Sequence, residues 1–147
     1  MAQATEQPGF TVVVVSPDGE LFRSQAVSIL VPAVEGYLGI LRGHAPMIAA
    51  MDIGELLIRT PDEHIVSLAV AEGIVEVRRS ETLILCDHAE FREDIDIARA
   101  SHAEERARER LSEQFGDVDV DRAAVAMKKA QNRIRVAQRK ERTKLVE

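Results

Sequence analysis

The amino-acid sequence predicts two domains of different class, a β-sandwich or flattened barrel followed by an antiparallel α-helical hairpin. Up to about residue 90, short apolar runs alternate with turn residues roughly every 8–12 positions, which is typical of all-β domains. From Ile95 onward the chain contains no proline and is rich in Ala, Arg, Glu and Lys, which favour helices. We therefore expect an N-terminal tail at 1–9, a β domain at 10–90 and the hairpin at 91–147.

The expected strands follow one another along the β domain. Residues 11–16 (TVVVVS) form a β-branched run that stops at a turn containing Pro17 and Gly19. Residues 26–34 (AVSILVPAV) form the next run, in which Pro32 favours an edge strand or a bulge. The other runs with strand character lie at 55–60, 65–71, 73–79 and 82–87.

Two helices are expected after the β domain. Asp94 is a candidate N-cap for the first helix. The sequence GDVDVD at 116–121 interrupts the helical pattern, with Gly116 as a stop and its aspartates as further caps. The second helix is expected from about Asp121 to beyond Arg139. Each helix has one apolar face, consisting of Ala100, Ala103, Ala107 and Leu111 in the first and of Ala123, Met127, Ala130, Ile134 and Ala137 in the second.

Alanine dominates both of these helix faces. A buried alanine methyl contributes only about 0.8 kcal/mol. The two helices can therefore approach closely, but they hold each other weakly. We expect a hairpin of marginal stability that can open or detach from the β domain.

Charge is distributed unevenly along the chain. The net charge of −6 combines nine basic and three acidic residues in 121–147, giving +6, with ten basic and twenty-two acidic residues in 1–120, giving −12. A basic C-terminal segment on an acidic body indicates contact with an acidic partner or a polyanion. We expect no signal peptide, because the first eight residues (MAQATEQP) are polar, and no membrane span, because no apolar run approaches roughly 20 residues. Cys86, the only cysteine, is expected to be a small buried side chain in a reducing compartment.

The sequence offers no evident catalytic constellation. His44, His64, His88 and His102 do not pair at metal-ligand spacing, and Cys86 has no second cysteine beside it, so no metal site is expected. The chain contains neither a Walker motif nor a G-x-S-x-G nucleophile motif.

Residues 35–46 (EGYLGILRGHAP) concentrate three glycines, a histidine and a proline. Gly36, Gly39 and Gly43 favour turns in a β-rich loop, some of them with positive φ. A phosphate cradle is the alternative, but no helix N-terminus follows to supply backbone amides. His44 is either a general base or a loop residue, and we favour the loop residue. Contact with another protein is the remaining functional interpretation of this stretch.

Four sequence motifs occur in order along the chain: VVSPDGELF, EGYLGILRGHAPMIAAMDIGELLIR, AEGIVEV and, before the charged helices, IDIARA. In sequence, order and spacing they resemble the epsilon subunits of bacterial F-type ATP synthases, over about residues 10–140. The EGxLGILxGHAP block is the most specific part of this resemblance. The resemblance implies a ten-stranded β-sandwich and a C-terminal helical hairpin, in agreement with the pattern described above.

The resemblance also implies a rotor subunit that is not an enzyme by itself. In this family the β domain lies at the foot of the gamma subunit, contacts the membrane-embedded c-ring and helps to couple proton flow to ATP synthesis. The implied partners also include the alpha and beta catalytic subunits. This implies a peripheral position at the cytoplasmic face of the inner membrane, without membrane insertion, nucleic acid, metal or a required cofactor. The contact loop carried over to this chain consists of Glu35, Tyr37, Leu38, Arg42, His44 and Pro46.

Two positions in this loop depart from the family pattern. Tyr37 stands where the family often has an acidic residue, and Arg42 stands where it often has proline. Tyrosine and arginine offer a stacking, cationic surface in place of an anion. We therefore carry over the position of the contact and not its charge pattern.

The sequence IDIARA at 95–100 resembles the ATP-binding motif of some family members. The resemblance implies that Asp96 accepts a hydrogen bond from the adenine amino group and that Arg99 and Arg106 face the phosphates. Binding members have arginine at the position of Lys129, and lysine lacks the bidentate fork. The alternative is that IDxxRA only starts and caps a helix, with Asp96 at the positive end of the helix dipole. The complete regulatory ATP site would consist of Glu90, Ile95, Asp96, Arg99, Ala100, Arg106, Lys129 and Arg133.

The basic second helix resembles the inhibitory element of the family. The resemblance implies that this helix extends into the cleft around the gamma shaft, where an acidic segment of the beta subunits attracts it. There it would obstruct ATP hydrolysis mechanically. The alternative is that the charges only solvate an exposed helix. The basic residues assigned to the inhibitory role are Arg122, Lys128, Lys129, Arg133, Arg135, Arg139 and Lys140.

A function of a different class is a free-standing β-sandwich adaptor whose basic helical arm binds nucleic acid or an acidic protein. This alternative accounts for the charge of the arm, but not for the GHAP and IDIARA motifs. The arm has no aromatic residue after Phe115 and therefore offers no surface for base stacking.

Overall fold

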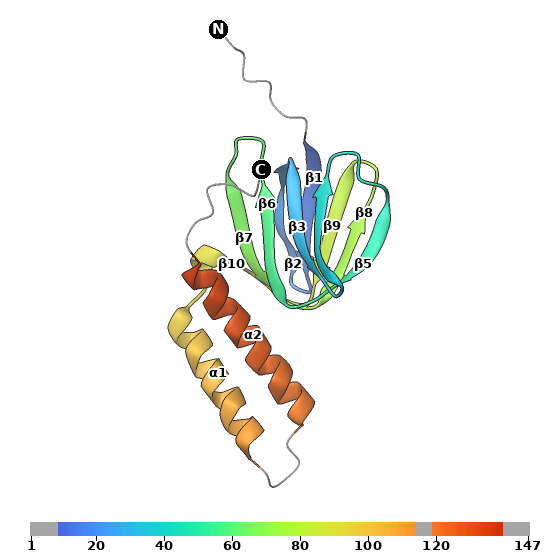
Figure 1. Ribbon diagram of the computed structural model, residues 1–147. Coiled ribbons are helices and arrows are strands. Elements are labelled where there is room, and N and C mark those ends of the chain that lie inside the picture. Colours follow the sequence, from blue (N-terminus) through green and yellow to red (C-terminus); the bar gives the residue numbers. More distant parts are fainter. Residues whose placement is uncertain (1–8, 114–118, 140–147) are drawn as a thin grey trace.

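The computed structural model describes residues 9–113 and 119–139. Its β domain contains ten strands, and two helices project from one end of that domain (Figure 1). This confirms the predicted fold class, a β-sandwich followed by a helical hairpin. The strands are β1 (Phe10–Ser16), β2 (Gly19–Ala26), β3 (Ser28–Ala33), β4 (Gly36–Leu41), β5 (Met47–Met51), β6 (Gly54–Arg59), β7 (Ile65–Val70), β8 (Gly73–Val77), β9 (Glu81–Cys86) and β10 (Ala89–Phe91).

Strand pairing divides the β domain into two groups of five. The strands follow the order β10-β7-β6-β3-β5-β8-β9-β1-β2, and β4 pairs with β3. One group is therefore β10-β7-β6-β3-β4 and the other is β5-β8-β9-β1-β2, joined at one corner through the pair Ala33–Met51. On the opposite side, Phe22 of β2 and Phe91 of β10 are in edge-to-face contact, with ring centroids 5.8 Å apart. The two groups thus enclose a nearly complete barrel.

One aliphatic core fills the space between the two groups of strands. Alternate residues of a strand point to opposite faces, and in β1 this places Val12 and Val14 in the core. Val14 lies opposite Ile84 in the parallel ladder between β1 and β9. Fully burying one such aliphatic side chain contributes about 1.5–3 kcal/mol. The largest fully buried side chains are Ile29, Ile40, Leu56, Ile58, Leu68 and Ile84.

The strands that the sequence pattern missed are the four edge strands, β2, β4, β5 and β10. An edge strand buries few side chains, so its sequence lacks a clear apolar period. In β2, for example, only Ala26 is buried. The pattern did identify the six inner strands. At Pro32 the pattern favoured an edge strand or a bulge. The edge strand is wrong, because Pro32 lies in the inner strand β3. Pro32 is tolerated because the pairing of β3 passes there from β6, at Leu30, to β5, at Ala33.

The helical region begins with a short 3₁₀ turn, η1 (Arg92–Asp94), followed by α1 (Ile97–Ser112) and α2 (Val120–Gln138). The expectation that Asp94 is the N-cap of the first helix is wrong, because this residue belongs to η1. Asp96 caps α1 instead, and its carboxylate accepts a hydrogen bond from the Arg99 N–H at 3.0 Å. An N-cap side chain satisfies one of the free amides of the first helical turn.

The second helix is capped and terminated in a similarly local way. Asp119, one of the aspartates expected as caps, accepts a hydrogen bond from the Arg122 N–H at 3.0 Å. The helix stops before Arg139 and not beyond it, because Arg139 has an extended backbone and the Arg92 guanidinium donates a hydrogen bond to its carbonyl. The expectations for the tail at 1–8, for Gly116 and for Lys140 lie outside the described residues.

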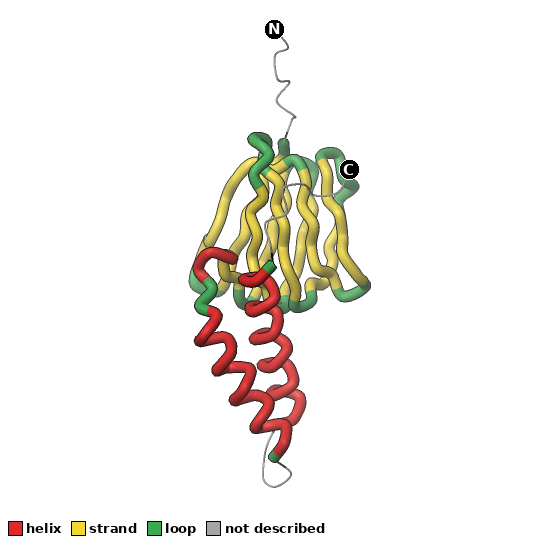
Figure 2. The backbone as a smooth tube through the Cα atoms, turned by 60° about the vertical axis from the view of Figure 1, so that its left-hand side comes forward, coloured by secondary structure: helices red, strands yellow, loops and turns green. Residues whose placement is uncertain are grey.

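Small side chains line the contact between α1 and α2, as the sequence predicts. Ala100, Ala107, Ala123 and Ala130 are all buried, with exposed fractions of at most 3%. Only the C-terminal half of α2 also lies against the sandwich, at β6 and β7. The opposite ends of both helices extend away from the β domain (Figure 1, Figure 2). The hairpin is therefore attached to the sandwich over a limited area.

Candidate functional site

The glycine-rich stretch 35–46 is not a single loop. Residues 36–41 form strand β4, and the chain then turns and enters β5. Gly36 and Gly43 have φ of 123° and 82°, in the region that favours glycine, whereas Gly39 lies within the strand. A phosphate cradle needs backbone amides that converge at a helix N-terminus. This stretch instead runs from strand to strand, which does not support such a cradle.

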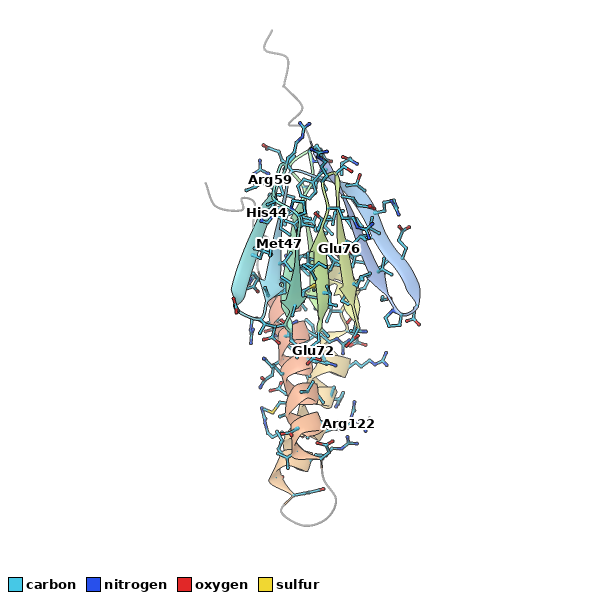
Figure 3. All side chains as sticks on the ribbon, turned by 90° about the vertical axis from the view of Figure 1, so that its right-hand side faces the viewer. His44, Met47, Arg59, Glu72, Glu76 and Arg122 are labelled. Atoms are coloured by element: carbon cyan, nitrogen blue, oxygen red, sulfur yellow. The ribbon has the colours of Figure 1, made fainter. Side chains whose placement is uncertain are left out.

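Strand β4 separates the predicted contact residues into two groups at opposite ends of the sandwich. Glu35 and Tyr37 lie at the end that carries the hairpin, and His44 and Pro46 follow the other end of β4, with Arg42. Figure 3 shows His44 at the end of the sandwich away from the helices. A six-residue strand spans about 20 Å. The stretch therefore presents two separate groups of side chains to its surroundings, one at each end of β4.

His44 has the surroundings of a structural turn residue. It is half-buried, and its Nδ1 atom lies 2.8 Å from the carbonyl oxygen of Ala45. Within the part of the chain that the structure describes, no carboxylate forms an ion pair with it. These surroundings do not resemble those of an oriented general base.

A concave apolar surface lies between β4 and β5, the two edge strands on one side of the sandwich. Its cavity of about 570 Å³ is lined by residues 33–38 and 47–50. Val34, Tyr37 and Ile48 lie there with exposed fractions of 63%, 57% and 70%. Exposed apolar side chains gathered around a hollow are typical of a protein-docking site. We call this the β4–β5 surface, defined by Val34, Tyr37, Leu38, Ile48 and Ala50.

The β4–β5 surface continues across the neighbouring strands. Ala50 of β5 is paired with Ile74 of β8, and Ile74 is paired with Leu85 of β9. Directly paired residues point to the same face of a sheet, and Ile74 and Leu85 are both substantially exposed. The apolar row therefore extends from the β4–β5 surface over the outer face of the second group of strands.

The residues proposed for a nucleotide site are only partly brought together. The Arg133 guanidinium forms a fork with Glu90, through hydrogen bonds of 2.8 and 3.3 Å. Lys129 and Arg133 line a cavity of about 10 Å³ with His88, which is about the space of one water molecule. Ile95 and Ala100 are buried, Asp96 caps α1, and Arg99 and Arg106 are exposed to solvent. In this conformation the Arg133 guanidinium is paired with Glu90 and is not free to bind a phosphate group.

The basic residues of α2 are also divided by the fold. Three of them form ion pairs with acidic residues of the β domain, and Arg122 and Arg135 are exposed. Lys140 lies outside the described residues. The three pairs are Lys128–Asp52 at 3.5 Å, Arg133–Glu90 at 2.8 Å and Arg139–Glu55 at 3.0 Å.

Further residues that join α2 to the sandwich are not evident from the sequence pattern. Asn132 is buried and donates a 2.8 Å hydrogen bond to the carbonyl oxygen of Gly54. Val136 is buried in a small cluster with Ala69 and Ile95. Asn132 and Val136 are four residues apart and share a helix face. Because Asn132 is polar, this face does not stand out as a row of apolar residues in the sequence.

Among the described residues, Cys86 has the largest shift in pKa. It is buried on β9, and burial, reinforced by the charge of Asp87, raises the pKa of its thiol to about 11. Such a thiol is a poor nucleophile near neutral pH.

The described residues contain no group of three or more His, Cys, Asp and Glu side chains arranged to hold a metal ion. In the same part of the chain, no helix is long and apolar enough to cross a membrane.

Both halves of the chain match domains of one protein family. The β-sandwich domain of the ATP synthase delta/epsilon chain matches residues 9–92, and the long α-helix domain of that chain matches residues 93–138. The boundary between the two matches lies directly after β10.

Relatives named ATP synthase epsilon chain are similar over most of their length. The protein from Bacillus licheniformis is 43% identical over 126 residues, which cover 86% of this chain and 95% of the relative. The protein from Syntrophomonas wolfei is 35% identical over 139 residues, which cover 95% of this chain and 98% of the relative.

Solved structures share the fold at lower sequence identity. A chain in the cryo-EM structure of the mitochondrial ATP synthase of Euglena gracilis superposes with a TM-score of 0.75 at 18% identity, covering 90% of this chain and 84% of that one. A chain of the Tetrahymena thermophila mitochondrial ATP synthase, in its central stalk and c-ring, gives a TM-score of 0.55 at 15% identity and covers 90% and 96%. The two domain matches and the close relatives together lead to one conclusion: this chain belongs to the ATP synthase delta/epsilon chain family.

Proposed function

We propose that this protein is the epsilon subunit of a bacterial F-type ATP synthase and acts as a non-catalytic part of its rotor. The observation that carries this proposal is the match of both domains to the family over almost the whole chain. In this role the protein associates with the gamma subunit, the c-ring and, through its hairpin, the alpha and beta subunits. It would work at the cytoplasmic face of the plasma membrane as a peripheral component of the complex.

The β4–β5 surface is the proposed contact with the rotor shaft. It is concave and apolar, and it is flanked by the unpaired edges of two strands, which suits a permanent protein partner. The two ends of β4 would then face different parts of the rotor. Arg42, His44 and Pro46 lie at one end, and Glu35 and Tyr37 lie at the other, beside the hairpin.

This contact is tested by charging its most exposed apolar residue. Ile48→Asp should weaken binding of the purified gamma subunit by about tenfold or more, because a charge would be buried in the interface. Leu21→Asp is the matched control, since Leu21 is also an exposed apolar residue but lies on β2, outside the β4–β5 surface. Equal affinities of the two variants, measured by calorimetry, would exclude this surface as the contact.

The hairpin is proposed to act as a mobile brake on ATP hydrolysis. Its helices meet through alanines and contact the sandwich over a limited area, which favours release of the hairpin from the β domain. The basic residues of α2 would then meet an acidic segment of the catalytic subunits and obstruct rotation. No catalytic group is required of this subunit.

Removing residues 92–147 and reconstituting the enzyme tests the brake. We expect the truncated subunit to assemble and to support ATP synthesis, while the enzyme hydrolyses ATP faster than with the intact subunit. Unchanged hydrolysis across a range of salt and ATP concentrations would exclude an inhibitory role of the hairpin. Failure to copurify with the catalytic subunits, with salt-sensitive RNA binding instead, would favour the adaptor function.

A regulatory ATP site at the hairpin is a second proposed function. It is favoured by Lys129 and Arg133, which line one small cavity, and by Glu90, which is hydrogen-bonded to Arg133. Because Arg133 is held by Glu90, ATP would have to displace this fork, and we expect weak binding. Titration of the isolated subunit followed by NMR tests this. The absence of chemical-shift changes at Asp96, Arg99 and Arg133 up to millimolar ATP would exclude the site.

A further inference from the structure

Three acidic residues of the β domain receive the basic face of α2. Asp52 follows β5 and Glu55 lies at the start of β6, whereas Glu90 comes from the distant strand β10. We call these three residues the acidic rim. Their partners are Lys128 and Arg133, in the middle and the C-terminal half of α2, and Arg139, which directly follows the helix. The contact thus extends over three turns of the helix and is not a single ion pair.

The innermost pair of the contact joins Glu55 and Arg139. Glu55 is 5% exposed, whereas the side chain of Arg139 is 34% exposed. The Oε2 atom of Glu55 lies 3.0 Å from Arg139 and accepts no hydrogen bond within the described part of the chain. Arg139 therefore supplies an opposite charge that partly compensates the Glu55 carboxylate for its lost hydration. If α2 left the sandwich, the carboxylate would be exposed to solvent again.

Few apolar contacts assist these charges. The cluster between the hairpin and the sandwich contains only Ala69, Ile95 and Val136, with Ala137 packed against it. The hydrogen bond from Asn132 to Gly54 adds one neutral polar contact. The three ion pairs are therefore a substantial part of the contact between α2 and the sandwich. Ion pairs are interactions that an acidic partner can replace.

We propose that the acidic rim is an internal docking site that competes with the acidic partner of the hairpin for the same basic residues. This inference rests on the proposed inhibitory function and assigns its control to Asp52, Glu55 and Glu90. Lys128, Arg133 and Arg139 cannot pair with the rim and with a second protein at the same time. The rim therefore holds the hairpin in the non-inhibiting position, and weakening the rim shifts the population toward the inhibiting one.

The position of the hairpin is measured in the isolated subunit, without any partner. Spin labels are attached at Arg79→Cys, in the turn between β8 and β9, and at Glu109→Cys, which is exposed on α1, in a chain that carries Cys86→Ala. Pulsed electron paramagnetic resonance then gives the distribution of distances between the labels. A docked hairpin gives one narrow distance, and a released hairpin gives a broad second population.

The test compares two triple variants that remove the same number of charges. The rim variant combines Asp52→Asn, Glu55→Gln and Glu90→Gln. The control variant combines Asp18→Asn, Glu72→Gln and Asp87→Asn, at turns of the sandwich on the same side as the hairpin. Figure 3 shows Glu72 at this end of the sandwich. Among the described residues, these three form no ion pair with the hairpin.

We expect the ratio of released to docked hairpins to rise at least tenfold in the rim variant and to change less than twofold in the control. In the reconstituted enzyme, the rim variant should hydrolyse ATP several times more slowly than the control. An unchanged distance distribution in the rim variant would overturn the internal docking site. A released hairpin with unchanged hydrolysis would support the docking site and count against the inhibitory function, so the two proposals fail separately.

A second comparison keeps the proposal falsifiable if the triple variant is poorly folded. Arg139→Gln leaves the buried Glu55 carboxylate without its partner, whereas Glu55→Gln leaves an arginine that can reach water. Arg139→Gln should therefore release the hairpin more often than Glu55→Gln does, and the double variant should release it less often than Arg139→Gln alone. Equal release by the two single variants would contradict the assigned role of Glu55.

Discussion

The two domains of this protein are held together by different kinds of side chain. The sandwich encloses fully buried Leu, Ile and Val residues, such as Leu56 and Ile58, each of which contributes about 1.5–3 kcal/mol. The hairpin is closed by Ala100, Ala107 and Ala130, whose methyl groups contribute about 0.8 kcal/mol each. Both contacts exclude water, but only the contact in the sandwich can stabilise a domain alone.

This difference fits the proposal that the chain combines a fixed sandwich with a movable hairpin. The sandwich can keep its shape while it transmits force, because its core does not depend on the hairpin. The hairpin depends on helix caps and on ion pairs with the sandwich, and ion pairs respond to salt and to competing charges. A regulatory element of this kind can change its position without unfolding the domain that carries it.

The largest expected effect is on the core of the sandwich. Leu56→Ala removes a fully buried side chain and should lower the free energy of unfolding of the β domain by about 2–5 kcal/mol. Equilibrium denaturation of the isolated subunit, followed by the circular dichroism of the strands, measures this loss. The control Ile74→Ala, at a side chain that is 46% exposed, should cost less than about 1 kcal/mol. Similar losses in both variants would contradict a core concentrated between the two groups of strands.

A smaller effect is expected at the contact between the helices. Ala130→Gly removes a buried methyl and adds the cost of glycine in a helix, together roughly 1–2 kcal/mol. Ala126→Gly, at an exposed position of the same helix, has only the helix cost of about 1 kcal/mol. Hydrogen exchange should accelerate in α1 and α2 and remain unchanged in the strands. Equal acceleration in the strands would show that both domains unfold as one unit.

The N-cap of α1 differs between sequence and structure: Asp94 is expected from the sequence, and Asp96 is observed in the structure. Asp96→Ala should destabilise α1 by about 1 kcal/mol, because the Arg99 N–H loses its acceptor. Asp94→Ala should have almost no effect, since Asp94 lies in η1. The helical circular dichroism of the isolated subunit during thermal melting compares the two variants. A larger loss from Asp94→Ala would reassign the cap.

The smallest expected effect concerns Cys86 and the independence of the two domains. Burial raises the pKa of this thiol from 9.0 to about 11. Because the folded pKa lies above the unfolded value, the resulting stabilisation is complete below about pH 9 and is lost as the pH rises through 11. At pH 8 the thiolate fraction falls about a hundredfold, so iodoacetamide should react with Cys86 on the order of a hundredfold more slowly than in the unfolded chain.

Deletion of the hairpin supplies the control for this thiol. Removal of residues 92–147 should leave the rate of Cys86 alkylation nearly unchanged, because Cys86 is buried in the core of the sandwich and not beneath the helices. A large increase in that rate would mean that the hairpin stabilises the sandwich, and it would weaken the distinction between a fixed and a movable domain.

The sequence pattern alone identified inner strands such as β1 and β6 because most of their side chains are buried. Strands such as β1 and β6 carry runs of Val, Leu and Ile that few other structures accommodate. The edge strands β2 and β4 bury few side chains and carry glycine, so their sequences resemble loops. The alanine spacing of the helices was equally informative, because a helix repeats its face every three or four residues.

The sequence by itself determined the two fold classes, the family motifs and the excess of positive charge in α2, because each depends on residues close together in the chain. Only the tertiary structure decided where those charges lie. Asp52 and Glu55 lie close together in sequence and Glu90 comes from a distant strand, and no local pattern indicates that they meet Lys128, Arg139 and Arg133. The same holds for the contact residues around β4, which are neighbours in sequence but lie at opposite ends of a strand. Local chemistry selects secondary structure, whereas the packing of distant segments decides which charges are free to bind a partner.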